Sequence, residues 1–469
     1  MPMLALLLSL LTLPPFFGDL PRSSIATKEF DKFSKDIGAY FAALETDDRK
    51  GAQESLNRIR EAYDKLAKRA KLDDPLKYVG DWDQILERGK TESRELKAAA
   101  GKGFVRYVSA WENSRIVCMV NVPAAYGKGD AYCPAIVALK PLLGMSGEVL
   151  EKEAAALATK AYGDLLATTI VIVPLGPERA VERKTESHEV EGSWMTDEGM
   201  TTLFYGVRVL LYDLHFDRAR IVLDGWKDAG LDAVTAASSF PSWFAGIINR
   251  SGEVGGPDVL YQNLGGSPLL YVEGGADARG ADLQELRNRC DGVTELEVIS
   301  DTESAVQPSD EARAKIAAWI GTRKRDLAPS RVSYLLGDIR FQSAAWVKAY
   351  EINRRSTAKP GDKDFPQIVA EIDRASNTIT IKTVNVLELF VFLNDALLDL
   401  GKPVVVVVNG VEKVRHPVKR DLGYLLENRF FGNSGDYGVY TAEVRIEGID
   451  PNVPKADSSE KDTDGGTPR

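Results

Sequence analysis

The first hundred residues carry a helical pattern of apolar positions. From residue 28 onward, apolar side chains recur every three or four positions, at Phe30, Phe33, Ile37, Phe41 and Leu44. A second such set lies in the segment GAQESLNRIREAYDKLAKRA, at Leu56, Ile59, Tyr63, Leu66 and Ala70. This period is typical of amphipathic helices. We therefore predict a helical N-terminal region over residues 27–100, with an antiparallel hairpin that packs as an appendage on the next domain.

From about residue 101, short β-branched runs alternate with helical stretches. The strand-like runs are RIVCMVNV (115–122), PAIVALK (134–140), TTIVIVPL (168–175), RIVLDG (220–225), FAGIINRSG (244–252), PLLYVEGG (268–275) and ELEVIS (295–300). Helical patterns lie between them, and the segment DEARAKIAAWIGTRKR closes the block near residue 325. Strands that alternate with helices favour a mostly parallel sheet with helices on both faces. We predict an α/β domain over residues 101–325.

After Pro329, strand-like runs follow one another without long helices between them. The segment NTITIKTVNV alternates with period two, and PVVVVV is separated from VEKVRH by Asn409 and Gly410. Asn-Gly between two extended runs favours a two-residue hairpin turn. We predict a separate antiparallel β domain over residues 326–449. Residues 450–469 have little apolar content, and we expect a disordered tail there.

The first residues resemble an export signal. Residues 3–13 read MLALLLSLLTL, which matches the apolar core of a secretory signal in length and is too short to span a membrane. Ser24 and Ala26 place small residues where a signal peptidase reads them. No Lys or Arg precedes the run, and a buried N-terminal segment is the alternative. We predict a signal peptide over residues 1–26 and a secreted or periplasmic protein without a membrane span, since no later segment has 18 successive apolar residues.

Composition narrows the possible partners and chemistry. The chain has 469 residues and a net charge of −10, which argues against nucleic acid or anionic membrane as the main partner. It holds only three histidines (His188, His215 and His416) and three cysteines. These cannot be spaced into a zinc-type cluster, and an odd, sparse set of cysteines is no disulfide framework. We expect no metal and no cofactor.

The order of segments in the α/β block resembles the α/β-hydrolase superfamily, in its esterase and prolyl-oligopeptidase-like branch. YCPAIVALK is similar to the third strand of that fold, FDRARIVLDGWKDAG to the fifth strand and nucleophile elbow, and AVTAASSFPSWFAGIINRSG to the helix and strand that follow. PLLYVEGGAD is similar to the seventh strand and acid loop, and ELEVISDTES to the eighth strand and histidine loop. The resemblance covers residues 101–325 and implies an α/β-hydrolase-like sheet there. The combination with a helical hairpin and a β domain resembles multi-domain bacterial secreted hydrolases.

The resemblance implies that Lys227 replaces the nucleophile. The family's elbow reads Gly-x-nucleophile-x-Gly, because the nucleophile occupies a strained strand-to-helix turn that tolerates only small flanking residues. The segment here is GWKDAG, residues 225–230. With Lys227 at the tip both flanks are small, whereas Asp228 at the tip would place Trp226 in the turn. A protonated lysine cannot attack a carbonyl as the family's serine does, and a Schiff base would need an amine of strongly lowered pKa.

The other catalytic positions match unevenly. Asp277, in the segment GGAD, stands at the family's acid position, although a plain loop aspartate is the alternative. The loop after the eighth strand reads SDTES, residues 300–304, so that Glu303 occupies the approximate histidine position. None of the chain's three histidines falls there. Related enzymes often have His-Gly after the third strand, where an amide faces the developing charge. Here Lys140 and Pro141 follow, and proline has no N–H.

These substitutions favour a protein without catalysis. We expect Lys227 to point toward Asp277, with Asp301 or Glu303 nearby, because a lone buried ammonium is costly. Alternatively, Lys227 extends from a filled cleft into solvent. The main hypothesis is a secreted pseudo-hydrolase that binds a small molecule, peptide or glycan. The alternatives are an active esterase or peptidase-type hydrolase with another nucleophile, such as Asp228, Ser238 or Ser251, and an enzyme that forms a Schiff base at Lys227.

Overall fold

The computed structural model of the protein describes most of the chain. The described residues are 20–22, 27–111, 114–128, 132–141, 148–177, 194–255, 259–275, 280–337, 342–353, 358–432, 434–436 and 438–449. Every helix within these ranges is too short or too polar to cross a lipid bilayer. The predicted signal peptide and C-terminal tail fall almost entirely outside them.

Helices form the N-terminal part of the described chain, as the apolar period predicts. They are α1 (Thr27–Glu45), α2 (Arg49–Ala70), the 3-10 turn η1 (Pro75–Lys77), α3 (Val79–Gly89) and α4 (Arg94–Ala98). The Asp48 side chain accepts a hydrogen bond from the Gly51 amide and so caps the start of α2. The helices α1 and α2 form the predicted hairpin.

The hairpin packs against the C-terminal β-strands. Its buried residues, such as Phe33, Ile37 and Ile59, belong to one hydrophobic core with residues 328–449. The rings of Phe41 and Phe430 are 5.5 Å apart. The prediction of an appendage on the next domain is therefore wrong. Amphipathic spacing shows that one helix face is buried, but it carries no information on which element covers that face.

The middle of the chain folds into an eight-stranded sheet with the order β1-β2-β4-β3-β5-β6-β7-β8. Its strands are β1 (Phe104–Trp111), β2 (Ser114–Asn121), β3 (Ala135–Leu139), β4 (Ile170–Pro177), β5 (Ile221–Trp226), β6 (Gly246–Arg250), β7 (Leu269–Glu273) and β8 (Leu296–Ser300). All neighbours from β4 to β8 pair in parallel, whereas β1 pairs with β2, and β2 with β4, in antiparallel fashion. The predicted mostly parallel sheet is confirmed.

Helices cover both faces of this sheet. The helices and turns of this part are α5 (Glu148–Tyr162), η2 (Gly163–Ala167), α6 (Asp197–Arg208), the π-helix η3 (Val209–Asp213), α7 (Ala229–Ser239), η4 (Tyr261–Leu264), α8 (Gly280–Cys290) and α9 (Asp310–Thr322). Apolar residues of α5 and α9 share one core with one face of the sheet. Residues of α6, α7 and α8 share a second core with the other face.

The described residues of the C-terminal part form two further sheets and one helix. Its elements are β9 (Arg331–Leu335), β10 (Ser343–Ala344), β11 (Val347–Ile352), β12 (Gln367–Asp373), β13 (Thr378–Val384), β14 (Val386–Leu393), β15 (Pro403–Val408), β16 (Val411–Pro417), α10 (Leu422–Phe431) and β17 (Ala442–Ile446). The strand orders are β10-β11-β14-β17 and β16-β15-β13-β12-β9. The predicted hairpin at Asn409 and Gly410 is confirmed, with φ of 51° and 81°. The pairing is antiparallel except between β13 and β15, which are parallel.

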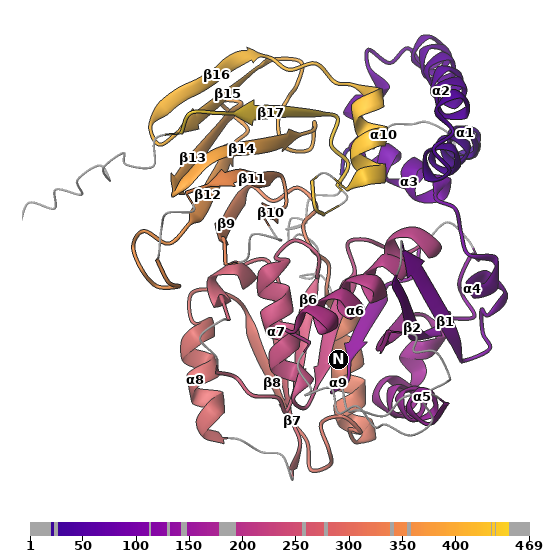
Figure 1. Ribbon diagram of the computed structural model, residues 1–469, viewed down its shortest axis with the longest axis vertical. Coiled ribbons are helices and arrows are strands. Elements are labelled where there is room, and N and C mark those ends of the chain that lie inside the picture. Colours follow the sequence, from indigo (N-terminus) through magenta and orange to yellow (C-terminus); the bar gives the residue numbers. More distant parts are fainter. Residues whose placement is uncertain are drawn as a thin grey trace, which may run out of the picture.

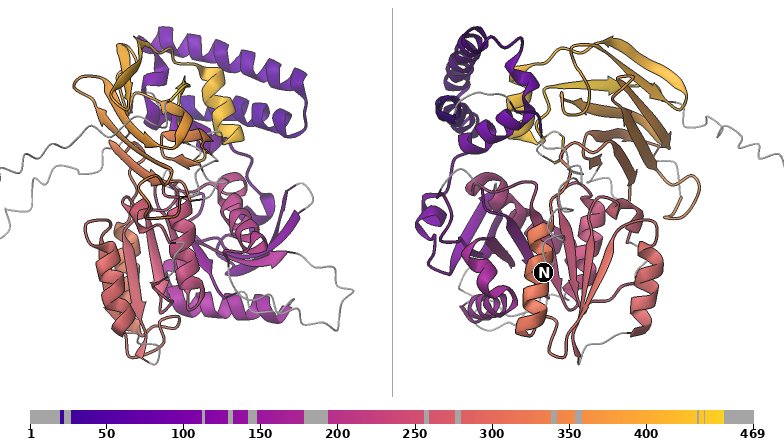
Figure 2. Two further views of the ribbon diagram at one scale, coloured as in Figure 1. Left: turned by 60° about the vertical axis from the view of Figure 1, so that its left-hand side comes forward. Right: turned by 180° about the vertical axis from the view of Figure 1, so that it is seen from behind.

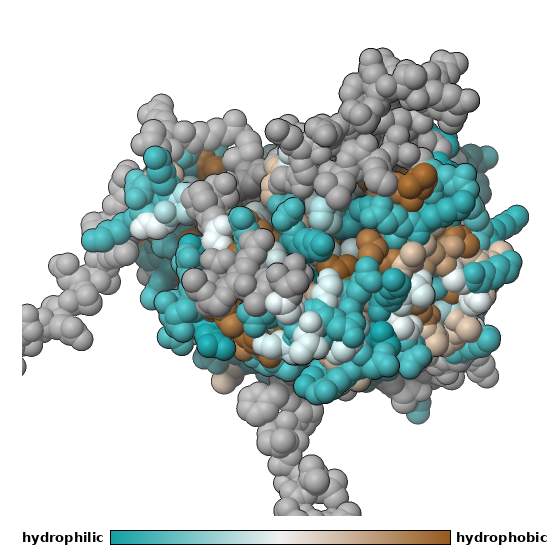
Figure 3. Space-filling model, turned by 90° about the horizontal axis from the view of Figure 1, so that it is seen from below, coloured by the Kyte–Doolittle hydropathy of each residue, from teal (hydrophilic) through white to brown (hydrophobic). Residues whose placement is uncertain are grey.

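The hairpin and the β-strands lie where the parallel strands of the large sheet begin (Figures 1 and 2). The Phe216 amide, ahead of β5, donates to the Glu87 carboxylate of α3 at 3.1 Å. The Tyr334 hydroxyl of β9 donates to the Ser239 carbonyl, at the end of α7, at 3.4 Å. The carboxyl ends of the strands therefore point away from both accessory parts. Figure 3 views the molecule from that side, where hydrophilic residues surround scattered hydrophobic ones.

Candidate functional site

A sharp turn joins β5 to α7, and Lys227 occupies its tip. Lys227 has a φ of 52°, in the left-handed region that is costly for a residue with a Cβ. Its amide donates to the Arg250 carbonyl at 2.8 Å, and its carbonyl accepts from the Gly230 amide at 2.7 Å. A Cβ on Gly225 would lie 2.2 Å from the carbonyl oxygen of Ala229, so this position requires glycine. These are the features of a nucleophile elbow.

A fully buried ion pair lies beneath the elbow. Asp224 and Arg250 are both 0% exposed. The guanidinium Nη2 is 2.7 Å from Asp224 Oδ2, and Nη1 donates to the Ala305 carbonyl at 3.1 Å. The Tyr162 hydroxyl donates to Asp224 Oδ2 at 2.9 Å. Because the Arg250 carbonyl also accepts the Lys227 amide, one residue ties the elbow to β6 and to the loop after β8.

Sequence reasoning missed this ion pair. Its signal was present, because Asp224 and Arg250 are opposite charges within two runs, RIVLDG and FAGIINRSG, that were expected to be buried strands. A charge in such a strand requires a partner, and strands adjacent in a sheet supply one. The pairing of β5 with β6 places Asp224 beside Ile248, two residues before Arg250.

The loops after β7 and β8 meet at the carboxyl edge of the sheet. The Gly275 amide donates to the Glu303 carbonyl at 2.8 Å. The Asp301 carboxylate accepts from the Ser309 amide at 2.7 Å and from the Glu303 amide at 3.3 Å. Burial acts to raise the pKa of Asp301, but these hydrogen bonds outweigh it and hold the pKa below its ordinary value. Asp301 is thus engaged within its own loop.

The predicted acid-position residue Asp277 lies outside the described residues. Lys227 and Glu303 are exposed, and Lys227 forms no ion pair with any residue in the described ranges. Neither Asp301 nor Glu303 is therefore its ion-pair partner. Whether Asp277 pairs with Lys227 stays a prediction, while the exposure of Lys227 is compatible with the alternative of a lysine that extends into solvent.

Two of the three histidines lie far from the elbow in the fold. His215 precedes β5, at the opposite edge of the sheet, where its Nδ1 is 4.0 Å from Glu87 Oε1. Burial lowers the pKa of His215. His416 is exposed on β16. His188 lies outside the described residues. The positions of His215 and His416 do not allow either to act as a base at Lys227.

The end of β3 carries a second lysine beside the elbow. Lys140 directly follows β3 and is 4% exposed. Its carbonyl accepts from the Trp194 indole at 2.6 Å, but its ammonium has no hydrogen-bond or ion-pair partner in the described part of the chain. Burial lowers the pKa of Lys140, and the charge of Glu153 on α5 opposes that effect only in part.

The alternative serine nucleophiles are engaged in structural contacts. The Ser238 hydroxyl, on α7, donates to the Thr235 carbonyl at 2.7 Å. The Ser251 hydroxyl donates to the Val272 carbonyl at 3.2 Å and accepts from the Gly274 amide at 3.0 Å. Both serines are buried. Asp228 is exposed beside Lys227 at the start of α7.

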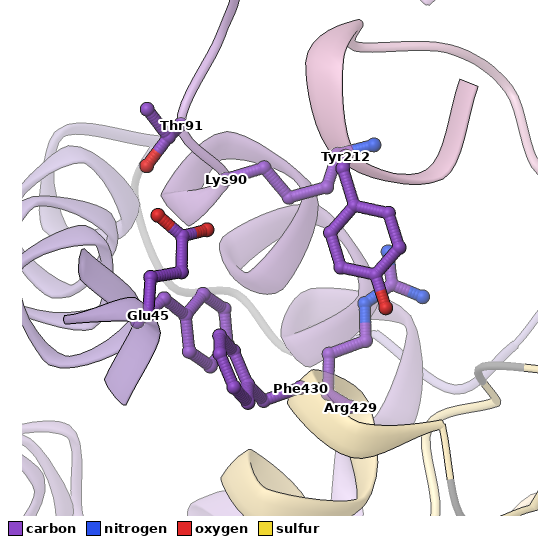
Figure 4. Close-up of a pocket in the computed structure, with 7 residues that line it drawn as sticks. Glu45, Lys90, Thr91, Tyr212, Arg429 and Phe430 are labelled. Atoms are coloured by element: carbon purple, nitrogen blue, oxygen red, sulfur yellow. The ribbon is translucent and has the colours of Figure 1, made fainter. Parts of the chain in front are cut away.

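A small hollow of about 30 Å³ lies elsewhere, where the three parts of the molecule meet (Figure 4). Its lining comes from α1, the segment after α3, the π-helix and α10, namely Phe41, Glu45, Lys90, Thr91, Tyr212, Arg429 and Phe430. Lys90 and Arg429 both pair with Glu87, at 2.6 and 2.8 Å. The hollow has room for only a few water molecules, and both of its cations already pair with the Glu87 carboxylate. No cluster of three or more metal-ligating side chains occurs among the described residues.

No family model and no curated protein sequence matches this chain. Among solved structures, a thermostable esterase is similar with 15% identity and a TM-score of 0.36, over 48% of this chain and 64% of that one. The chain thus spans less than two thirds of that esterase.

Two further solved structures are similar over nearly the same share of the chain. An acylaminoacyl peptidase of Pyrococcus horikoshii has 12% identity and a TM-score of 0.35, over 47% of this chain and 42% of that one. An S-formylglutathione hydrolase of Agrobacterium tumefaciens has 15% identity and a TM-score of 0.35, over 47% of this chain and 94% of that one. The strand order and the elbow described above give the α/β part its resemblance to the α/β-hydrolase superfamily.

Proposed function

We propose that this protein binds a ligand at its hydrolase-like elbow and does not hydrolyse it. The observation that carries the proposal is Lys227 at the tip of a fully formed elbow. Acyl transfer by this fold needs a nucleophile with a base within hydrogen-bond reach. A lysine exposed to water and remote from His215 and His416 supplies neither.

The cost of the elbow supports a retained binding role. A left-handed non-glycine residue stores about 1–3 kcal/mol of strain. The ion pair beneath it removes two charges from water, which is costly in itself. Strain at a ligand-facing turn points toward function. We infer that the turn is maintained because it presents Lys227.

The contacts of the alternative groups argue against catalysis by another residue. Ser238 and Ser251 are buried and bonded to backbone groups, without a histidine beside them in the described chain. A Schiff-base mechanism needs an apolar environment around the amine. Lys227 is instead exposed, next to the exposed carboxylate of Asp228.

Hydrolysis assays test the proposal directly. We expect the purified full chain to show no turnover of p-nitrophenyl acetate or butyrate above buffer, no labelling by a fluorophosphonate, and no borohydride-trapped adduct with pyruvate. Cooperative unfolding of the same sample shows that it is folded. Ester turnover that exceeds buffer, or a label or adduct located by mass spectrometry, would overturn the proposal.

Export is part of the same proposal, and the apolar run over residues 3–13 supports it. Residues 20–22 contact α3, since the Pro21 carbonyl accepts from the Gly80 amide at 2.8 Å. Cleavage after residue 26 would remove that contact. We expect a shortened N-terminus in the periplasm or medium, read by N-terminal sequencing. A full-length chain that stays in the cytoplasm would contradict export.

A further inference from the structure

The ends of β3 and β5 flank the point where the sheet changes its direction of winding. From β3 the chain proceeds to β4 on one side, whereas β5 pairs with β3 on the other. The helix after β3, α5, packs on one face of the sheet. The helix after β5, α7, packs on the opposite face. Connections that leave on opposite faces open a crevice at the carboxyl ends of the strands, which is where open α/β sheets bind ligands.

Two lysines stand at this point. Leu139 of β3 is level with Gly225 of β5, so Lys140 and Lys227 follow within one and two residues of that paired position. With strands about 4.8 Å apart and a rise of about 3.3 Å per residue, their backbones are close neighbours. Neither ammonium has a hydrogen-bond or ion-pair partner among the described residues.

The two lysines differ in exposure. Lys140 is 4% exposed, and a buried ammonium without a partner is costly. Lys227 is exposed at the elbow tip. Asp228 is adjacent to Lys227 in sequence, and Glu153 of α5 acts on Lys140 without forming an ion pair. An anion bound in the crevice would neutralise the charge of the buried Lys140 ammonium. It would also interact with the exposed ammonium of Lys227.

We propose that the crevice between the ends of β3 and β5 binds an organic anion, a carboxylate or a phosphate, with Lys140 and Lys227 as its cationic groups. This inference rests on the proposed function, in which the site binds without hydrolysing. A charge-assisted hydrogen bond to each lysine supplies the affinity. Screening by salt weakens the contribution of the exposed Lys227 more than that of Lys140.

Calorimetric titration of the full chain tests this with two probes, inorganic phosphate and benzoate. We expect at least one probe to bind, and Lys227→Met to weaken its binding at least tenfold. Lys71→Met is the matched control, because Lys71 also has a φ of 52° but lies at the end of α2. It should leave binding unchanged. Lys227→Arg keeps the charge and should retain most of the affinity.

Proton uptake on binding distinguishes a direct role of Lys140 in anion binding from a purely structural role. Since burial lowers the pKa of Lys140, a bound anion raises it again, and binding takes up protons at pH values where the free protein has lost that proton. Titrations in buffers of different ionisation enthalpy measure this uptake, and Lys140→Met should abolish it while remaining folded by circular dichroism. If Lys140→Met does not fold, the affinities of Lys227→Met, Lys227→Arg and the control Lys71→Met test the anion proposal.

The probe that binds more tightly shows whether the site prefers a tetrahedral phosphate or a planar carboxylate. The anion proposal is overturned if neither probe binds, or if Lys71→Met and Lys227→Met weaken binding equally. That result leaves the proposed binding function standing for an uncharged ligand. Ester hydrolysis by the wild-type chain would overturn the proposed function itself, whatever the probes show.

Discussion

Two opposite charges lie in the middle of a sheet whose neighbouring residues are apolar. Asp224 and Arg250 bond to each other and to Tyr162 and Ala305, so that each guanidinium nitrogen and each carboxylate oxygen has a partner. A buried pair of this kind adds little net stability over apolar residues of the same size. Loss of one partner, however, leaves an uncompensated charge in the interior.

We therefore expect Arg250→Met to lower the free energy of unfolding by about 3–5 kcal/mol. The double variant Asp224→Leu with Arg250→Met should be far less affected, because no lone charge remains. Urea denaturation measures both. Arg415→Met, which breaks an exposed pair with Glu412, is the control and should leave stability essentially unchanged. Equal losses in the single and double variants would show that the pair is not coupled.

The roles of some individual residues could be predicted from the sequence, and those of others could not. Lys227 could be located because the elbow has a steric rule, with small residues two positions to either side. Arg250 could not, because its role depends on which strand lies beside β5. Lys140 was noted only for the proline that follows it. Its surroundings depend on tertiary contacts, since the charge of Glu153 on α5 acts on it and Trp194, 54 residues further along the chain, donates to its carbonyl.

The elbow as an element depends on close packing between β5 and α7. The Cβ that Gly225 lacks would lie 2.2 Å from the Ala229 carbonyl oxygen and 2.7 Å from the Ala233 Cβ. Backbone and short side chains cannot move aside as the end of a flexible side chain can. The strand-to-helix turn therefore fixes glycine at this position independently of any catalysis.

We expect Gly225→Ala to lower the free energy of unfolding by about 1–3 kcal/mol, as overpacking does. Gly321→Ala is the matched control, since Gly321 lies in α9 and a Cβ there meets no atom within 4 Å. The control should raise stability by up to about 1 kcal/mol, because alanine is the better helix former. Thermal unfolding distinguishes the two. A neutral Gly225→Ala would contradict the tight elbow.

Element types were predictable, but partners between elements were less so. The period of apolar residues identified the hairpin, the parallel strands and the Asn-Gly turn. It could not show that α1 and α2 pack on the C-terminal β-strands, nor that β13 and β15 run parallel. The period of apolar residues indicates that one face of an element is buried. Which other element covers that face depends on contacts between residues that can be hundreds of positions apart.

One buried cluster joins the three parts of the whole molecule. Glu87 of α3 lies between Lys90 and Arg429, whose nitrogens are 2.6 and 2.8 Å from its two oxygens. Lys90 also donates to the carbonyls of Leu210 and Leu214, at 3.2 and 2.7 Å. The N-terminal helices, the α/β part and α10 are thus held by the same few charges, and Figure 4 shows Lys90 and Arg429 of this cluster.

This cluster predicts a dependence of stability on pH. Burial, partly offset by Glu87, lowers the pKa of Lys90 from 10.5 to about 8. Between these values the unfolded chain binds a proton that the folded chain has released, so this contribution to the free energy of unfolding rises with pH. We expect the stability of the wild type, relative to Lys90→Met, to increase from pH 8 to pH 10.5. Denaturant titrations at several pH values measure this difference. A constant difference would contradict the lowered pKa.

The placement of the accessory parts also has a consequence for ligand size. The hairpin and the β-strands lie at the edge where the parallel strands begin, on the side of the sheet opposite to the elbow. They do not enclose the carboxyl ends of the strands in a chamber that would exclude large ligands. Any selection of ligands by size must therefore come from loops of the α/β part itself. The accessory parts therefore place no obstacle between Lys227 and an anionic group at the end of a polymer, or one fixed to a large particle.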